Sequence, residues 1–483
     1  MVRRLTLGIL FAHAVITSLR ADVVLDWNSL LLDAIRVETT GPTLSTRNLA
    51  ILSVATYEAI NSILRTHQPY YAYLDAPADA SPEAAVIAAG REVMLALYPT
   101  FSARTEDLYQ TGLAALPPTP ATTNGLAVGL AAAQLILNLR SSDGSQTDVT
   151  YLPSNAPGQW QRTPPFFRPP LTPQWRYVTP FCLPTIEPFL PPPPPELAGA
   201  EYAAALNEVK LIGSKTSTTR TAEQSQIAVF WSDFSYTAMP PGHWHEITAS
   251  IVRTRGTPLA DTARLLALLA LAQADAAIVC WEAKFRWNLW RPLTAIRRAD
   301  EDGNPLTAAE SAWDHYLNAP PFPAYTSGHS TFSKASARVL ARFYGTDDLS
   351  FTVRSDSLPG VFRSFTNLTD CVDEIGMSRI YGGIHFQFDN REGKRTGGRI
   401  GDYVSANFLL PNTTLPLLRL ESFTNGIPQL RLHGLFGRNV ILENSTDLKS
   451  WSSIFTNSSV LGGLLLTDPT APGQSPRFYR IRQ

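Results

Sequence analysis

The chain has 483 residues, 44% of them hydrophobic and 17% charged, which suits a folded globular protein with a sizeable core. Its formal net charge of −1 gives no overall field that would favour nucleic acid or an anionic membrane as a partner. The length predicts two to three domains, and the 38 prolines predict long ordered loops around a core.

The first 21 residues, MVRRLTLGILFAHAVITSLRA, have the form of a secretory signal peptide. Arg3 and Arg4 form a positive start, and the apolar run over 5–11 is too short to span a bilayer. Small residues allow cleavage after Ala14 or Ala21. We therefore expect residues 1–21 to be removed and the protein to be secreted or periplasmic; a disordered start is the alternative.

From residue 22 to about 410, apolar residues recur mostly at helical spacing. The clearest predicted helices are 47–64, 83–97, 126–140, 196–211, 221–234 and 243–255. Proline-rich connections separate them. The longest connection, 151–195, ends in PPPPP and has no clear period, so we expect an extended strap over the surface.

One stretch, 258–281, is apolar enough to be tested as a membrane span. Asp261, Arg264 and Asp275 interrupt it, and charges at such depth are costly in lipid. We therefore predict a long helix buried in the protein core and no transmembrane segment in the mature chain. Cys280, one of only three cysteines, lies in this stretch as a small core residue, and the chain has no disulfide framework or CxxC metal motif.

Three chemically distinctive segments carry cations and small hydrogen-bond donors. In KFRWNLWRP, Lys284 and Arg291 are seven residues apart, which places both on one face of a helix. FPAYTSGHSTF contains Ser327 and Gly328 at the start of a predicted helix, where free backbone N–H groups favour an anion. SRIYGGIHFQFD adds Arg379. These groups together predict a site for a tetrahedral oxyanion, because arginine forks match oxyanions and lysine adds a point charge.

Two histidines accompany these donors. His329 follows Ser-Gly directly, and His385 follows Arg379 by six residues. One imidazole could bond the central atom of the anion, and the other could move protons. Asp389, four residues after His385, could hold the far ring nitrogen and fix the tautomer. Each segment also has a purely structural interpretation: a solvated helix face for the cations, a surface ion pair for Arg379 with Asp389, and core packing for the histidines. All three interpretations would have to hold at once.

The ordered set K-x6-RP, SGH and SR-x5-H-x3-D resembles the superfamily of type 2 phosphatidic acid phosphatases (PAP2) and vanadium haloperoxidases. The resemblance covers roughly residues 22–410 and implies a mainly α fold with a helical-bundle catalytic domain. The wording DAAIVCWEAKFRWNLWRPLTAIR is more similar to exported bacterial vanadium-dependent haloperoxidases than to the short phosphatases. One departure is Thr326, where the family usually has proline; proline would preset the turn, so Thr326 loosens it without removing a ligand.

The resemblance implies a vanadate cofactor, with hydrogen peroxide and a halide as substrates and hypohalous acid as product. The residues implied to hold the vanadate oxygens are Lys284, Arg291, Ser327, Gly328 and Arg379. His385 would bond vanadium, and His329 would act as the acid–base residue. Trp281 and Phe322 stand where fungal chloroperoxidases carry aromatic residues around the halide; core packing is an equally good interpretation of both.

Two other functions stay open. A phosphatase would use the same site on a phosphomonoester, with His385 as nucleophile and His329 protonating the leaving alcohol. The second is a non-catalytic exported protein whose C-terminal part contacts polysaccharide or the cell surface. The halide, the organic substrate and the oligomeric state are not indicated by the sequence.

The composition changes near residue 411. From there to 483, short alternating runs separated by Gly, Asn, Asp and Pro predict a small antiparallel, β-sandwich-like module. Its aromatic residues Trp451, Phe478 and Tyr479 could contact a polysaccharide, although such residues are typical of cores. His433 is its one histidine, and we interpret it as structural. The predicted organisation is thus 1–21, 22–410 and 411–483.

Overall fold

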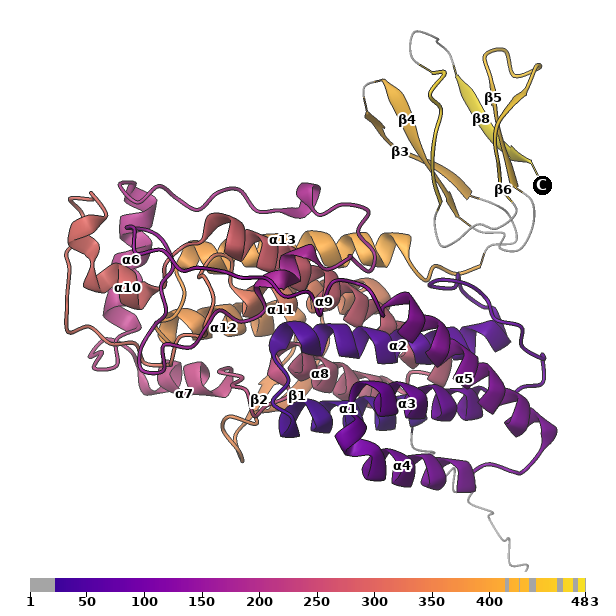
Figure 1. Ribbon diagram of the computed structural model, residues 1–483, viewed down its shortest axis with the longest axis horizontal. Helices are drawn as coiled ribbons and strands as arrows, with labels where there is room; N and C mark the ends of the chain where they lie inside the picture. The colour runs from indigo at the N-terminus through magenta and orange to yellow at the C-terminus, as the bar shows by residue number, and fades with distance from the viewer. Residues whose placement is uncertain are drawn as a thin grey trace, which may run out of the picture.

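The computed structural model describes residues 22–412, 417–424, 426–433, 440–457, 464–471 and 477–482. The predicted signal peptide, residues 1–21, lies outside these ranges. Up to residue 412 the described chain is dominated by helices, and from 417 onward it consists of strands (Figure 1). The prediction of a mainly α fold with a small C-terminal β part is confirmed.

The described residues contain 13 α-helices. They are α1 (Val23–Val37), α2 (Pro42–Leu64), α3 (Pro82–Leu97), α4 (Ser102–Ala114), α5 (Pro120–Leu139), α6 (Ala200–Ile212), α7 (Ala222–Phe230), α8 (Met239–Arg255), α9 (Leu259–Trp287), α10 (Pro292–Arg297), α11 (Gly328–Tyr344), α12 (Leu368–Tyr381) and α13 (Gln387–Asn407). Several begin at a proline, earlier than the apolar periodicity suggested. Proline is tolerated in a first turn because the N–H that it lacks would have no partner within the helix.

Two predicted helices proved too long. The segment 196–211 is helical only from Ala200, because Glu196 to Gly199 forms a turn closed by a backbone hydrogen bond of 2.9 Å. The segment 221–234 is helical only to Phe230, and Asp233 then has a positive φ of 45°. This early end of α7 places Asp233 in a loop that reaches the site described below.

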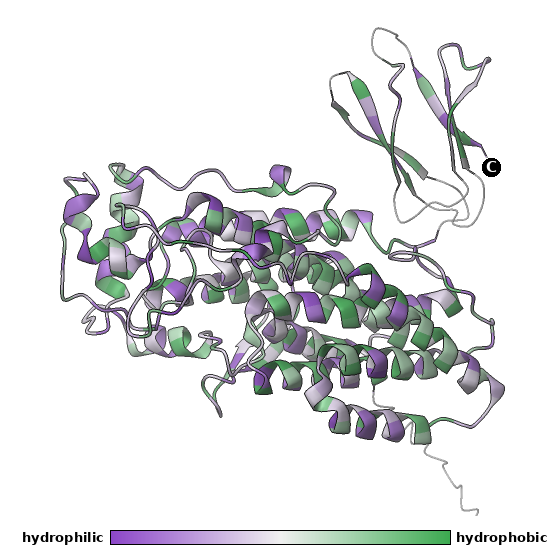
Figure 2. Ribbon diagram, viewed as in Figure 1, coloured by the Kyte–Doolittle hydropathy of each residue, from purple (hydrophilic) through white to green (hydrophobic). Residues whose placement is uncertain are grey.

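Helix α9 forms the centre of the bundle. It packs against α2, α11 and α13, and nearly all of its residues are buried, as predicted for 258–281. Figure 2 shows hydrophobic residues gathered along the helices of the bundle. Among the described residues, α9 and α5 are long and apolar enough to cross a membrane by composition, but 94% of the relevant α9 window is buried inside the protein.

Close contact between α11 and α13 brings two motif segments together. A Cβ atom at Gly397 would collide with the carbonyl oxygen of Thr331, and one at Gly393 would lie 2.8 Å from the carbonyl oxygen of Ser327. The glycines therefore let the two backbones approach. The Ser327 N–H donates to the Asp389 carbonyl at 3.1 Å, so the start of α11 is tied to the start of α13.

The proline-rich segment 151–195 is an extended strap, with only two short 3-10 turns at Pro173–Tyr177 and Glu187–Phe189. Asp275 of α9 anchors it. Its buried carboxylate accepts the backbone N–H groups of Phe181, Cys182 and Leu183 at 2.6–2.9 Å. The charge that interrupts the apolar stretch of α9 therefore fastens the strap to the bundle.

The described part of the C-terminal module contains two three-stranded antiparallel sheets. Their strands are β3 (Leu417–Thr424), β4 (Ile427–His433), β5 (Val440–Ser445), β6 (Ser452–Asn457), β7 (Leu464–Thr467) and β8 (Phe478–Arg482). The sheet orders are β3-β4-β7 and β6-β5-β8, and Leu430, Leu432, Leu442 and Leu466 form the core. A further hairpin, β1 (Phe351–Arg354) with β2 (Phe362–Phe365), lies within the helical part and was not predicted.

The aromatic residues of the tail pack within the module. Trp451 is half-buried beneath the guanidinium of Arg480, whose Cζ lies 4.1 Å from the ring centroid. The Tyr479 hydroxyl donates to Asp468 at 3.0 Å. These contacts favour packing over an open polysaccharide-binding face.

We expect Asp275→Ala to release the strap. The change leaves buried N–H donors without an acceptor, and each such donor costs about 1–3 kcal/mol. The free energy of unfolding should fall by about 3 kcal/mol or more in urea denaturation, and trypsin should cut after Arg162 or Arg176 faster than in the wild type. Asp275→Asn keeps an acceptor oxygen and should show a smaller effect; unchanged cleavage in the alanine variant would contradict the anchoring role.

We expect the helical part to fold without the β module if the chain is cut after Asn412. The cut must spare Pro411 and Asn412, because Pro411 pairs with His67 and the Asn412 N–H donates to the Thr66 carbonyl at 2.9 Å. The shortened chain should keep the thermal transition of the helical part, measured by circular dichroism. Loss of that transition would show that the module belongs to the same folding unit.

Candidate active site

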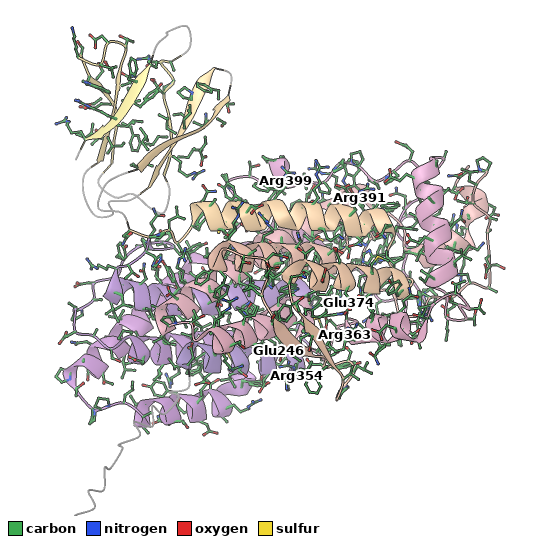
Figure 3. All side chains as sticks on the ribbon, turned by 180° about the vertical axis from the view of Figure 1, so that it is seen from behind. Glu246, Arg354, Arg363, Glu374, Arg391 and Arg399 are labelled. Carbon is green, nitrogen blue, oxygen red and sulfur yellow. The ribbon has the colours of Figure 1, made fainter. Side chains whose placement is uncertain are left out.

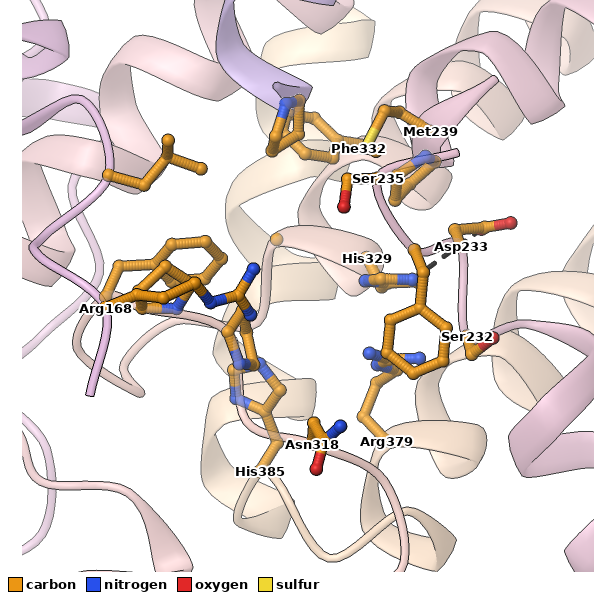
Figure 4. A pocket seen from close by; sticks show the side chains of 18 of the residues that line it. Arg168, Ser232, Asp233, Ser235, Met239, Asn318, His329, Phe332, Arg379 and His385 are labelled. Carbon is orange, nitrogen blue, oxygen red and sulfur yellow. Dashed lines mark ion pairs between the residues drawn. The ribbon is translucent and has the colours of Figure 1, made fainter. Parts of the chain in front are cut away.

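Three segments distant in sequence meet at one pocket, where Figure 4 shows His329, Arg379 and His385. The segments are the end of α9 with the start of α10, the N-terminus of α11, and the end of α12 with the start of α13. They carry all ten predicted site residues: Trp281, Lys284, Arg291, Phe322, Ser327, Gly328, His329, Arg379, His385 and Asp389. A cavity of about 120 Å³ opens onto Trp281, Phe322, Gly328, His329, Arg379 and His385. Lys284, Arg291, Ser327 and Asp389 lie in the layer behind this lining.

Lys284, Arg291 and Arg379 are all buried. Burial lowers the pKa of Arg291 to about 9 and that of Arg379 to about 10, and it also lowers the pKa of Lys284. Charged groups lose hydration when buried, so each cation is held at a cost that an anion at this place would offset.

Lys284 organises the loop before α11. Its ammonium donates to the carbonyl oxygens of Pro323 and Ala324 at 3.0 and 3.1 Å and to that of Thr326. These bonds use all three of its N–H donors. In this structure Lys284 therefore acts through its charge and through the shape of the loop, and not through a free donor as the sequence suggested.

Ser327 caps α11. Its hydroxyl oxygen accepts the Ser330 N–H at 3.3 Å and lies 3.0 Å from the Ser330 hydroxyl, which also donates to Asn390 Oδ1 at 2.9 Å. Gly328 is the first residue of the helix, where backbone N–H groups have no helical partner. A helix start of this kind favours a negative charge.

The two arginines keep donors that no described residue satisfies. Arg291 Nε and Nη1 donate to the Phe322 and Ile384 carbonyls, both at 2.8 Å, and Arg379 Nη1 donates to the Trp231 carbonyl at 2.7 Å. Arg291 Nη2 and Arg379 Nε are buried without a hydrogen-bond partner among the described residues. Native proteins rarely leave buried donors unpaired, so these atoms indicate a ligand that accepts hydrogen bonds.

The neighbours of His385 fix its tautomer. Its Nε2 lies 3.1 Å from Arg291 Nη1, and its Nδ1 lies 2.8 Å from Asp389 Oδ2. Arginine can only donate, so Nε2 carries the lone pair and Nδ1 carries the hydrogen. Burial and then Arg291 lower the pKa of His385 well below its ordinary value, which keeps the ring neutral. A neutral imidazole with a carboxylate behind it is the usual form of a metal-binding histidine.

His329 faces Asp233, a residue that the sequence did not indicate. Its Nε2 lies 3.6 Å from Asp233 Oδ2, and Figure 4 shows the ring between Asp233 and the centre of the pocket. Burial, followed by the charge of Arg379, lowers the pKa of His329 well below its ordinary value. The ring is therefore neutral near pH 7 and able to accept a proton.

Trp281 and Phe322 form an aromatic wall, with ring centroids 5.0 Å apart. Lys284 Nζ and Arg291 Cζ lie 4.9 and 5.0 Å from the Phe322 centroid. The strap closes this side, since Trp281 Nε1 donates to the Leu171 carbonyl at 3.2 Å. The two aromatics line the cavity, so they border the site as well as packing the core.

Several lining residues lie outside the three motifs. Asp233 and Ser232 come from the loop after α7, and Arg168 comes from the strap. Arg168 could not be recognised from the sequence, because the strap lacks any regular period. The pair Ser232-Asp233 directly after an apolar helix, followed by His243 and His245 in GHWHE, could have drawn attention as a polar cluster.

Comparison with known proteins finds similarity in sequence and in fold to vanadium haloperoxidases. The VCPO second helical-bundle domain matches residues 264–409, which include all the predicted site residues. The vanadium chloroperoxidase of Curvularia inaequalis is 28% identical over a match that covers 39% of this chain and 40% of that protein. The match thus spans less than half the length of this relative.

Solved structures extend the similarity. A bacterial vanadium-dependent iodoperoxidase has a TM-score of 0.72 and 27% identity, over 82% of this chain and 98% of that one. A bacterial vanadium-dependent chloroperoxidase in its holo form has a TM-score of 0.61 and 20% identity, over 76% and 92% of the two chains. The latter similarity concerns the fold.

We expect oxyanion binding to take up a proton at pH 6. His329 is neutral in the free site because its pKa is lowered, and a bound dianion offsets the positive field and raises that pKa. Sulfate is a suitable probe because it does not titrate near neutrality. Calorimetry in buffers of different protonation enthalpy should show uptake of up to about one proton, and His329→Asn should abolish it. A wild-type binding enthalpy that is independent of the buffer would contradict this.

Proposed function

We propose that the chain is a vanadium haloperoxidase, which binds vanadate at this site and oxidises a halide with hydrogen peroxide. The reaction consumes one peroxide, one halide and one proton, and it yields hypohalous acid and water. The observation that carries the proposal is a pair of buried, unpartnered arginine donors, Arg291 Nη2 and Arg379 Nε, in the same site as a neutral histidine. That histidine is His385, whose unprotonated Nε2 lies 3.1 Å from Arg291 Nη1. An oxyanion of a Lewis-acidic metal fits both features.

The residues present fit vanadate in charge and in donor type. Arg291 Nη2 and Arg379 Nε would hold its oxygens together with the Ser327 hydroxyl and the N–H groups at the start of α11. His385 Nε2 would bond the metal, and Asp389 would keep that nitrogen unprotonated. When bound, vanadate supplies the Lewis acidity that activates peroxide toward halide.

His329 moves the protons. As a neutral base it would accept a proton from hydrogen peroxide, and as an imidazolium it would return that proton to the hypohalite oxygen. Asp233, behind His329 Nε2, stabilises the charged ring. Lys284 and the arginines keep the surrounding field positive, which favours entry of halide and stabilises negative charge on oxygen.

The aromatic wall of Trp281 and Phe322 would form the halide pocket. Trp281 and Phe322 support a pocket of chloroperoxidase type, and both lie against the cavity. The relatives named above include a chloroperoxidase and an iodoperoxidase. Chloride, bromide and iodide therefore need to be compared in the same assay.

The size of the cavity favours a peroxidase over a phosphatase. Its volume of about 120 Å³ suits peroxide and halide, whereas pockets that enclose drug-sized ligands measure roughly 300–1,000 Å³. A phosphatase needs room for the alcohol part of its ester.

The first 21 residues resemble a signal peptide, which supports secretion or export to the periplasm as the setting of the reaction.

We expect the purified protein, loaded with orthovanadate, to brominate a phenolic dye in the presence of peroxide. His385→Ala should lower kcat/KM by more than about 100-fold, since the ligand itself is lost and outer-shell changes alone cost 10–100-fold. His67→Ala, a histidine in the bridge to Pro411 and outside the site, should keep wild-type activity.

The outcome that would contradict this proposal is specific. Dye bleaching by His385→Ala at the wild-type rate would contradict the proposed bond between His385 and vanadium. Rapid hydrolysis of p-nitrophenyl phosphate by the vanadate-free protein, with no dye reaction after loading, would establish the phosphatase in its place.

A further inference from the structure

We propose that His243 is a positioning residue of this site: it holds the Asp233 carboxylate against His329 and keeps it from pairing with Arg379. The inference rests on the proposed function, because it concerns the same oxyanion site. His243 belongs to α8 and does not line the cavity. It acts through Asp233, which does.

A series of contacts connects His243 to His329 through Asp233. His243 Nδ1 lies 3.1 Å from Asp233 Oδ1, and Asp233 Oδ2 lies 3.6 Å from His329 Nε2. On its other side His243 Nε2 lies 2.8 Å from the Arg354 carbonyl oxygen. Each carboxylate oxygen of Asp233 thus faces a different histidine.

The partners of His243 show that it carries a positive charge. A carbonyl oxygen and a carboxylate oxygen both accept hydrogen bonds, so both ring nitrogens must donate, and only the imidazolium has two N–H groups. The pKa agrees: burial lowers it, but Asp233 and the Arg354 carbonyl outweigh burial and raise it above its ordinary value. The other titratable groups that act on this ring are Glu246, Asp356 and the neutral His329.

The position of His243 is fixed from several sides. Its ring packs on Trp231, with centroids 4.7 Å apart. The hairpin that supplies the Arg354 carbonyl is clamped by two ion pairs, Arg354 to Glu246 of α8 at 3.1 Å and Arg363 to Glu374 of α12 at 2.5 Å (Figure 3). The imidazolium is therefore a rigid counter-charge, as a positioning role requires.

The balance of charge explains why the site needs this counter-charge. The Asp233 carboxylate stabilises the charged guanidinium of Arg379, although the two form no direct ion pair. A free Asp233 carboxylate would turn to Arg379 and occupy the donors that we assign to the oxyanion. Held by His243, it stabilises His329 and leaves Arg379 Nε unpartnered among the described residues. The arrangement favours binding of an external anion over an internal one.

The test measures sulfate affinity of the vanadate-free full-length protein by calorimetry. His243→Leu should weaken sulfate binding by about tenfold, because Asp233 then competes for Arg379; this corresponds to about 1.4 kcal/mol. Adding Asp233→Asn in the same chain removes the competitor and should restore the affinity to within about twofold of Asp233→Asn alone. A purely structural histidine would show no such rescue.

His245 provides a matched control. It is a buried histidine two residues along the same helix, and its Nδ1 pairs with Asn28 Oδ1 at 2.6 Å, away from the site. His245→Leu should destabilise the fold in thermal unfolding and leave sulfate affinity unchanged.

Two results would overturn the inference: wild-type sulfate affinity in folded His243→Leu, or affinity that stays weak in the double variant. Sulfate binding that responds to His243 in a protein that does not oxidise halide after vanadate loading would support this inference and contradict the proposed function. The two proposals therefore fail separately.

Discussion

The structure depends on the burial of three cations in one small space. Lys284, Arg291 and Arg379 lie within the helical bundle, and the carboxylates beside them, Asp389 and Asp233, are each engaged with a histidine. Burying a charge is expensive unless a partner of opposite charge is present. The remaining positive charge is compensated only when an anion binds. The unpaired arginine donors therefore favour binding of that anion.

The scaffold makes this arrangement possible by rigid close packing. Gly393 and Gly397 let α13 lie directly on α11, which sets His385 and Asp389 beside the start of α11. Asp275 fastens the strap to α9, and the strap in turn supports Trp281 through the Leu171 carbonyl. A site that holds uncompensated charge needs such support, because a looser frame would relax until the cations found internal partners.

The sequence predicted the helical class and the C-terminal strands, because these are local patterns of spacing and residue type. The prediction that Lys284 and Arg291 share one face of a helix was wrong, because α9 ends at Trp287 and Arg291 caps α10. The sequence also missed contacts that depend on where the chain turns. Asp233 was placed inside a helix that in fact ends at Phe230, and His243 was simply a residue of a predicted helix. Lys284 was expected to donate to the anion, but the loop carbonyls that use its donors are brought near only by the fold.

The most direct test of the account is a crystal structure of the protein soaked with orthovanadate, with data collected above and below the vanadium absorption edge. The account predicts one anomalous peak at bonding distance from His385 Nε2, with Arg291 and Arg379 donating to the surrounding oxygens. A peak elsewhere, or a site that stays empty while vanadate is present in large excess, would contradict it.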